Sequence, residues 1–499
     1  MKSKQQIDRQ ILIVPLVIIV FLSILFISMP YESLGALTVM RSFLGDDIGV
    51  YYILLGMGVF CTTIYIAFSK YGNIKLGNDE KPEYDSFAWG AMIFTSTMAA
   101  DIIFYSLCEW ALYAGDDYVA SLGPMQVWAP TFPLFHWGPV AWSFYIILAV
   151  ALGFMLHVRG TTKQKFSEAC RPLLGSRTDG SVGKIIDLFA IFALLAGAAT
   201  TFSLATPLLS AALAEVLGIT PTVILTIIIL IVVAIIYTVT VLMGMKGISG
   251  LAKFSVYLFF VLLLYVLIGG GQTRYIIETG VASLGNLTQN FIVLSTWTDP
   301  LRQDSFPQNW TIFYWAYWLV YCVATPFFIG MISKGRTIKN TIIGAYGWGL
   351  AGTFMSFIIL GNYGLSKQMS GEFDMVGYIA AGEPIADTIV RLFGTLPFPQ
   401  IGLWLLVVNM IIFYSTTFDA ITMVVSGYSY KELRAGEEPG KKIRAFWSVL
   451  FVLLPIALIF SESTLNNLQS VAIVAAFPIG IILLVIIVGF FKDAKKHIA

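Results

Sequence analysis

The chain has 499 residues, of which 58% are hydrophobic and 12% are charged, and its formal net charge is +1. A soluble globular domain carries about 25% charged residues, so this composition excludes a soluble protein and predicts an integral membrane protein. The near-zero net charge gives no support to binding of nucleic acid.

Apolar stretches long enough to cross a bilayer, roughly 20 residues each, occur about twelve times. They cover residues 10–29, 49–69, 87–114, 134–157, 184–213, 222–244, 249–270, 309–333, 340–363, 398–427, 444–461 and 468–491. We therefore predict an all-α membrane protein with about twelve transmembrane helices. The first stretch lacks a small-residue cleavage site and is interpreted as a retained span.

The lysines and arginines orient these spans. With the N-terminus inside, 25 of the 30 basic residues fall in inside segments and five fall outside. Because positive charge is retained on the cytoplasmic side, we expect both termini, each a short tail, to be cytoplasmic. Residues 271–308 and 364–397 are then external, and each contains a segment that can form an amphipathic surface helix, around Arg274–Thr288 and Ile385–Phe393. One polytopic domain fills residues 1–499.

An aromatic-rich stretch, WTIFYWAYWLVYCVAT, lies inside the eighth span from Trp310 to Thr325. At about 100° per residue, one face of this helix gathers most of its aromatic side chains, while Trp315 falls off that face. The face contains Trp310, Tyr314, Tyr317, Trp318, Tyr321 and Thr325. Tryptophan and tyrosine normally collect at the membrane interfaces, so an aromatic face that continues to mid-membrane needs another explanation.

A quaternary ammonium ligand is one explanation. Such a group is charged but has no N–H to donate, so aromatic faces are its natural partners, at roughly 0.5–2 kcal/mol per ring. Packing between helices is the other explanation, and the aromatic face alone does not separate the two.

Two carboxylates lie in the third span, where ionisable groups are costly and point to function. Asp101 falls near the middle, at the depth of the aromatic face. It is compatible with contact to a cationic ligand, with a coupling proton, and with pairing to another helix. The preceding residues 95–100 are small or hydroxylated, which favours close backbone approach or local unwinding. Glu109 lies two turns further out, in an external vestibule or in an interfacial structural role.

Three further positions are candidates for ion coupling. Lys253, in the seventh span, either extends to the interface or serves as an internal cation. Thr416 and Thr417, in the tenth span, offer oxygen ligands to a small cation or bond back to their own helix. No metal site is predicted, because the sequence brings no carboxylate cluster to any of the three histidines, His136, His157 and His497.

Several motifs closely resemble the betaine/choline/carnitine transporter family: WTIFYWAYW at 310–318, ISKGRT at 332–337, FHWGP at 135–139, TDP at 298–300 and GEEP at 436–439. The resemblance covers nearly the whole chain, and the spacing is most similar to the carnitine/γ-butyrobetaine exchangers. It implies a secondary transporter, not an enzyme, that moves choline, glycine betaine or carnitine across the plasma membrane by alternating access.

The resemblance also implies an architecture. Two N-terminal helices (1–86) would precede two inverted five-helix repeats of the LeuT-like type, 87–270 and 309–491, joined by the external connection 271–308. Family members of this kind are typically trimers, so the expected partners are a small quaternary ammonium substrate, the lipid bilayer and two further copies of the chain.

Carried over residue by residue, the resemblance places the trimethylammonium group in an aromatic box of Tyr317, Trp318 and Tyr321. The family usually has tryptophan where Tyr317 stands, and a phenol offers a weaker cation–π face. Trp310 matches an outer or secondary substrate site. The full predicted substrate-binding set is Tyr317, Trp318, Tyr321, Trp310, Tyr314, Asp101, Trp137 and Trp142.

Coupling remains open at this point. Thr416 and Thr417 match hydroxyl ligands of the family's sodium site, whereas an aspartate at 101 looks like the choline-type, proton-linked branch and favours a substrate without a carboxylate. Ion-independent exchangers carry a basic residue in span seven, for which Lys253 is a displaced candidate. Sodium, proton and ion-free exchange are alternatives. No other cofactor is implied.

The main rival function is a carrier of another amino-acid-like cation. An intramembrane enzyme would need a catalytic set at one depth, and a channel would need repeated filter sequences or rings of polar groups. The sequence contains neither.

Overall fold

The computed structural model describes residues 6–96, 99–161, 163–243, 245–433, 437–461 and 465–498, with side chains described everywhere except 245–253. Within these ranges the chain is helical, and the only β structure is two isolated bridges, Ile7–Tyr430 and Lys75–Thr337. Nine helical segments of the described residues are long and apolar enough to cross a membrane, and three bent helix pairs raise the number to twelve. The prediction of an all-α membrane protein is confirmed.

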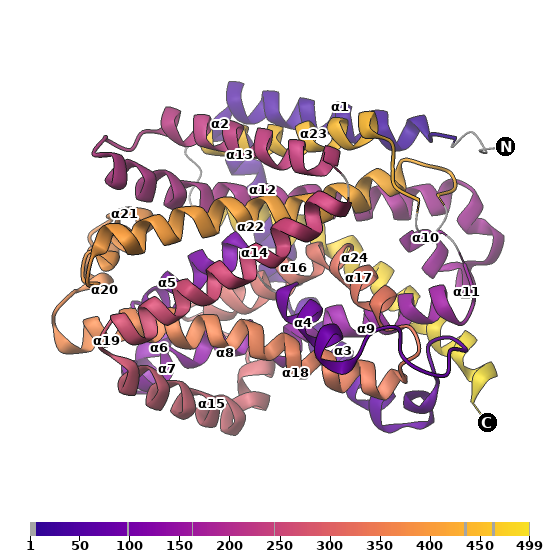
Figure 1. Ribbon diagram of the computed structural model, residues 1–499, viewed down its shortest axis with the longest axis horizontal. Coiled ribbons are helices and arrows are strands. Elements are labelled where there is room, and N and C mark those ends of the chain that lie inside the picture. Colours follow the sequence, from indigo (N-terminus) through magenta and orange to yellow (C-terminus); the bar gives the residue numbers. More distant parts are fainter. Residues whose placement is uncertain are drawn as a thin grey trace.

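Each predicted span corresponds to a helix or a helix pair. In chain order these are α1 (Arg9–Ser28), α3 (Val50–Phe68), α4 (Ser86–Thr95) with α5 (Ala100–Ala114), α9 (Pro139–His157), α12 (Ser181–Leu217), α13 (Val223–Met243), α14 (Met245–Leu264) with η4 (Tyr265–Gly269), η5 (Pro307–Thr311) with α16 (Ile312–Tyr321) and α17 (Thr325–Ile332), α18 (Ile338–Ser356) with η6 (Phe357–Gly361) and α19 (Asn362–Ser370), α22 (Pro399–Tyr428), α23 (Lys441–Phe460) and α24 (Leu465–Ala494). Figure 1 shows the two ends of the chain on the same side of the molecule, as an even number of spans requires.

The connections contain more helix than the sequence predicts. The additional helices are α2 (Pro30–Arg41), α6 (Asp117–Leu122), α7 (Met125–Trp128), α8 (Thr131–His136), α10 (Phe166–Ala169), α11 (Arg171–Leu174) and α20 (Met375–Ala380). Of the two predicted amphipathic segments, α21 (Ile385–Phe393) has the predicted bounds, and α15 (Thr273–Thr296) is longer at its C-terminal end. The axis of α15 turns by 108° from the preceding span, so α15 does not continue that span.

Two spans are interrupted near their middles, the third and the eighth. The axes of α4 and α5 differ by 67°, and those of α16 and α17 by 58°. In the eighth span Pro326 occupies the first turn of α17, where its missing N–H costs nothing and its ring prevents the helix from running through. The third span breaks within the predicted 95–100 stretch, of which Thr97 and Met98 lie outside the described residues.

Glycines bring the fourth and eighth spans into backbone contact. A Cβ on Gly330 of α17 would lie 2.7 Å from the Ala149 carbonyl oxygen and 2.8 Å from the Gly153 amide of α9. Such distances leave no room for any other residue at Gly330. The close approach fixes α9, and the aromatic side chains on it, against the interrupted eighth span.

Candidate functional site

The predicted site residues surround α16 in three groups. Successive residues on a helix point about 100° apart, so Tyr317 and Trp318 contact different neighbouring helices. The structure therefore divides the predicted aromatic face. We name the three groups the Trp318 cluster, the Asp101 cluster and the His136 cluster, and define each below.

The Trp318 cluster consists of Trp318 from α16, Trp142 and Tyr145 from α9, and Trp137 just before α9. The ring centroid of Trp318 lies 4.7 Å from Tyr145, 5.4 Å from Trp142 and 5.8 Å from Trp137. The Trp142 and Trp137 rings pack edge to face on Trp318, at 60° and 68°, the arrangement aromatic quadrupoles prefer, and the Tyr145 ring is tilted at 57°.

The tryptophans of the Trp318 cluster are buried and well supported, and Tyr145 is partly buried. The three tryptophans are at most 5% exposed. Gly349 of α18 seats the Trp142 ring, because a Cβ there would lie 2.7 Å from it. In the described part of the chain, the indole N–H groups of Trp142 and Trp318 are buried without an acceptor, which leaves them able to bind an oxygen atom of a ligand.

The Asp101 cluster consists of Asp101, Thr201, Tyr317 and Tyr321. The hydroxyl of Tyr317 donates to Asp101 Oδ2 at 2.5 Å, and the Ile102 amide donates to Oδ1 at 3.0 Å. Thr201 of α12 contacts the hydroxyls of both tyrosines. Asp101 lies in the first turn of α5, where unpaired N–H groups and the helix dipole favour a negative charge.

The His136 cluster consists of Glu109, Tyr113, His136 and Thr311. The Tyr113 hydroxyl contacts Glu109 Oε1 and lies 2.6 Å from His136 Nδ1, and His136 Nε2 lies 3.0 Å from the Thr311 hydroxyl. The predicted outer residues pack on this cluster: the Trp310 ring lies 4.9 Å from Tyr113, and the Tyr314 ring stacks at 4.9 Å on His136.

The His136 cluster contains a contact that the sequence did not indicate, and it bears on the two alternatives for Glu109. His136 and a carboxylate do come together, with Nδ1 3.7 Å from Glu109 Oε1. Glu109 is fully buried and therefore does not line an open vestibule. Both groups come from helices separated along the chain by the α6–α7 connection, and only folding brings them into contact.

Two aromatic links join the clusters. The indole N–H of Trp137, in the Trp318 cluster, donates to Glu109 Oε2 at 2.8 Å. The ring of Tyr105, on α5, lies 5.9 Å from Trp137, 5.5 Å from Tyr314 and 6.5 Å from Tyr317. Tyr105 is fully buried. Its ring contacts a member or a neighbour of each cluster and so links the three clusters.

Among the described residues, no contact joins Thr416 or Thr417, the predicted ion-coupling residues of α22, to these clusters. Thr416 donates to the carbonyl of Phe413 in its own helix at 3.2 Å, which is the back-bonding arrangement. Thr417 is partly buried next to it. The side chain of Lys253 lies outside the described residues.

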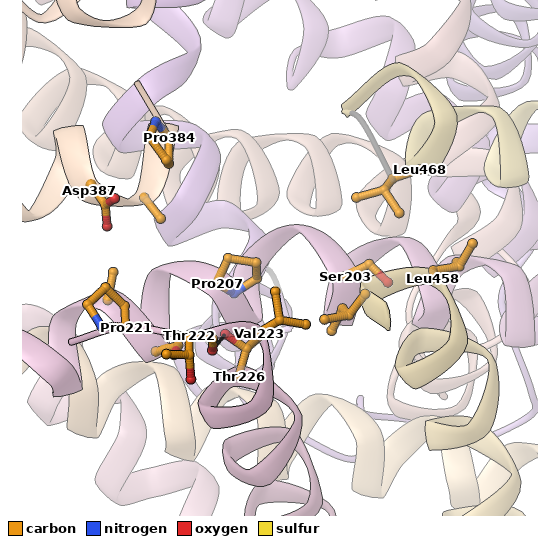
Figure 2. Close-up of a pocket in the computed structure, with 14 residues that line it drawn as sticks. Ser203, Pro207, Pro221, Thr222, Val223, Thr226, Pro384, Asp387, Leu458 and Leu468 are labelled. Atoms are coloured by element: carbon orange, nitrogen blue, oxygen red, sulfur yellow. Dashed lines mark hydrogen bonds between the residues drawn. The ribbon is translucent and has the colours of Figure 1, made fainter. Parts of the chain in front are cut away.

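A cavity of about 500 Å³ lies elsewhere, between α12, α13, α21 and the adjoining ends of α23 and α24. Figure 2 shows Asp387 and Pro384 on the other side of this cavity from Pro207 and Val223. None of its lining residues belongs to the three clusters, so it is separate from the aromatic site.

Sequence reasoning missed four members of these clusters, Tyr113, Tyr145, Thr201 and Thr311, and also Tyr105, which links the clusters. Tyr145 carried a signal, because it follows Trp142 by three residues and such residues share a helix face. Thr201 sits among small residues of α12 and carried no signal in the sequence.

Comparison with known proteins places the chain. Residues 10–499 match the BCCT family, described as betaine/carnitine/choline family transporters. The chain belongs to this family. It is 30% identical over 469 residues to the glycine betaine transporter OpuD of Bacillus subtilis, covering 92% of this chain and 88% of the relative.

Two further relatives of the BCCT family match over similar lengths. A carnitine transporter of Acinetobacter baumannii is 28% identical over 435 residues, which are 86% of this chain and 78% of the relative. The uncharacterized transporter YeaV of Escherichia coli is 28% identical over 454 residues, 90% of this chain and 92% of the relative. The protein is accordingly a multi-pass membrane transporter of the betaine/carnitine/choline type and not an enzyme.

Proposed function

We propose that this BCCT protein is a secondary active transporter that binds the ammonium group of a quaternary ammonium compound at the Trp318 cluster. The observation that carries this proposal is the meeting of four aromatic rings, from α9 and the interrupted eighth span, in the interior of the helix bundle. Because a quaternary ammonium group has no N–H, ring faces are the groups that can hold it.

Alternating access is the mechanism that suits this site. The tryptophans of the Trp318 cluster are almost entirely buried, so a ligand reaches them only when surrounding helices move. The interruptions at α4/α5 and α16/α17 lie beside the clusters, and broken helices around a central site are the usual elements of such movement. We propose that they begin the two inverted repeats, 87–270 and 309–491.

Choline is the substrate that we favour. The Asp101 carboxylate accepts a hydrogen bond from the hydroxyl of Tyr317 on α16. It would repel the carboxylate of glycine betaine or carnitine. Two relatives are named for glycine betaine and for carnitine, which supports the class of substrate. The unpaired indole N–H groups of Trp142 and Trp318 would bind the oxygen of the substrate's tail.

The remaining expectations complete the proposal. The 25-to-5 distribution of basic residues supports cytoplasmic termini, and the family supports a homotrimer in the plasma membrane. Coupling to sodium would use Thr416 and Thr417, coupling to protons would use a buried carboxyl, and ion-free exchange would use a basic group such as Lys253.

Transport by the purified protein in liposomes tests the proposal. Labelled choline, glycine betaine and carnitine are each offered with a sodium gradient, with a proton gradient of either direction, and with internal substrate but no gradient. We expect saturable uptake of choline that unlabelled trimethylammonium compounds inhibit. Uptake seen only with internal substrate identifies a carnitine/γ-butyrobetaine-type exchanger. Uptake of primary amines with no effect of trimethylated compounds would refute the aromatic site and favour a carrier of another amino-acid-like cation.

A further inference from the structure

The His136 cluster contains more proton-binding groups than its contacts require. A phenol carries one proton, so Tyr113 donates either to Glu109 or to His136, but not to both. The second contact therefore needs a proton from the neighbour itself. Either His136 Nδ1–H donates to the phenol while the phenol donates to a Glu109 carboxylate, or a protonated Glu109 donates to the phenol while the phenol donates to His136.

These two arrangements differ by one proton when the protonation of His136 Nε2 is included. In the first, neutral His136 has an unprotonated Nε2, which accepts from Thr311. In the second, Nε2 is protonated and donates to Thr311, whose hydroxyl can do either. Because Tyr113 and Thr311 can reverse their roles, the cluster gains or loses a proton without losing a hydrogen bond.

The surroundings of the cluster do not compensate a change in its net charge. Glu109 and His136 are both fully buried, and no lysine or arginine of the described residues lies within ion-pair distance of Glu109. The other titratable groups that face Glu109 are Tyr105 and Cys108 on α5 and Tyr314 on α16, which are neutral at physiological pH. One added proton therefore removes the net charge of the cluster, and an unpaired buried charge is costly.

The Glu109 carboxyl group is also hydrogen-bonded to the Trp318 cluster. Trp137 donates its indole N–H to Glu109 Oε2 at 2.8 Å, and its ring packs 5.8 Å from Trp318. A charged acceptor makes a hydrogen bond roughly twice as strong as a neutral one. A cation at the Trp318 cluster is attracted to a Glu109 carboxylate in the same buried region, and a proton on Glu109 removes this attraction.

We propose that Glu109, Tyr113 and His136 form a proton-binding site that holds a proton when the Trp318 cluster is empty and releases it when an organic cation binds there. This inference rests on the proposed function. The site joins α5, α8 and η5, which are the outer parts of the interrupted third and eighth spans and the helix before α9. Linkage is reciprocal, so protons weaken cation binding by the same factor as the cation weakens proton binding.

The test measures choline binding and proton release together. Choline is added to the detergent-purified full chain, its affinity is read from tryptophan fluorescence, and released protons are read with a pH-indicator dye. In the unmodified protein we expect affinity to fall about tenfold from mildly alkaline to mildly acidic pH, a typical coupling, with protons released on binding. Glu109→Gln should bind choline with less than about a twofold pH dependence and release no protons.

Two further variants control this test. Glu278→Gln changes an exposed carboxylate on α15 and should behave like the unmodified protein. Tyr113→Phe keeps Glu109 but removes its phenol donor, so the pH at which choline affinity changes should rise by about one unit. Tyr113→Phe still tests the proton site if Glu109→Gln does not fold.

The outcomes separate this proposal from the proposed function. Choline binding without proton release, or proton release that persists in Glu109→Gln, overturns the proton site and leaves the transport function intact. If none of choline, glycine betaine and carnitine binds, the proposed function fails, and infrared spectra still test the site. They should show a protonated carboxyl band in the choline-free protein that Glu109→Gln lacks, and a band unchanged by that substitution refutes the proposal.

Discussion

The two buried carboxylates of α5 are alike in one respect and opposite in another. Asp101 and Glu109 each accept a hydrogen bond from a tyrosine hydroxyl. Beyond Tyr317 the described contacts lead to the hydroxyls of Thr201 and Tyr321, whereas beyond Tyr113 lies an imidazole. The hydroxyl chain offers no second base to receive a proton at neutral pH, so we propose that Asp101 acts as a fixed charge and Glu109 as an exchangeable one. In this proposal the two carboxyl groups differ in role because their surroundings differ.

The largest effect should come from removing Trp318, the ring that the other three rings of the aromatic site contact. Trp318→Ala deletes a desolvated cation–π partner of about 2 kcal/mol, so choline affinity should fall at least about 30-fold. Trp404→Ala, which removes an exposed tryptophan of α22, is the matched control. Unchanged affinity in fluorescence-monitored titration of Trp318→Ala would remove the aromatic site, and both carboxylates would then need another explanation.

A smaller effect, on selectivity, should separate Asp101 from Glu109. Asp101→Gly removes a fixed negative charge, so the ratio of glycine betaine to choline uptake should rise by about tenfold. Glu109→Gln should leave that ratio within about twofold. Competition uptake in liposomes measures both ratios. Equal shifts in the two variants would show that the carboxylates do not have distinct roles.

Thr201→Val should sharpen the comparison by cutting the hydroxyl chain beyond Tyr317. The substitution keeps the shape of the side chain but removes its contacts with Tyr317 and Tyr321, so the free energy of unfolding should fall by about 1 kcal/mol. Thermal unfolding in detergent measures this loss. The pH dependence of choline binding should be retained, because it belongs to the other carboxylate. A loss of pH dependence in Thr201→Val would place the proton at Asp101.

The smallest effect is expected at Tyr145, the one tyrosine of the Trp318 cluster. Tyr145→Phe keeps the ring face 4.7 Å from Trp318 and removes only a hydroxyl, so choline affinity should change by less than about twofold. Tyr145→Ala, which removes the face, should weaken binding by about fivefold. Equal losses in the two variants would indicate that Tyr145 acts through its hydroxyl.

The sequence by itself determined the membrane class, the approximate positions of the twelve spans and the concentration of aromatic residues on the eighth. These follow from local properties, because an apolar stretch of about 20 residues and its flanking charges are visible without knowledge of the fold. The small and hydroxylated residues before Asp101 likewise indicated where the third span is interrupted. The motifs around Trp137 and Trp318 were sufficient to indicate the family.

The tertiary structure alone decided which residues meet. Tyr317 and Trp318 are neighbours in sequence, yet one contacts Asp101 and the other Tyr145, because adjacent helical side chains diverge and each finds a different helix. Glu109 and His136 are 27 positions apart in the sequence, and no local periodicity relates them. Contacts between helices depend on how the whole bundle packs. Only the fold therefore determined that His136 lies next to Glu109 and not next to another carboxylate.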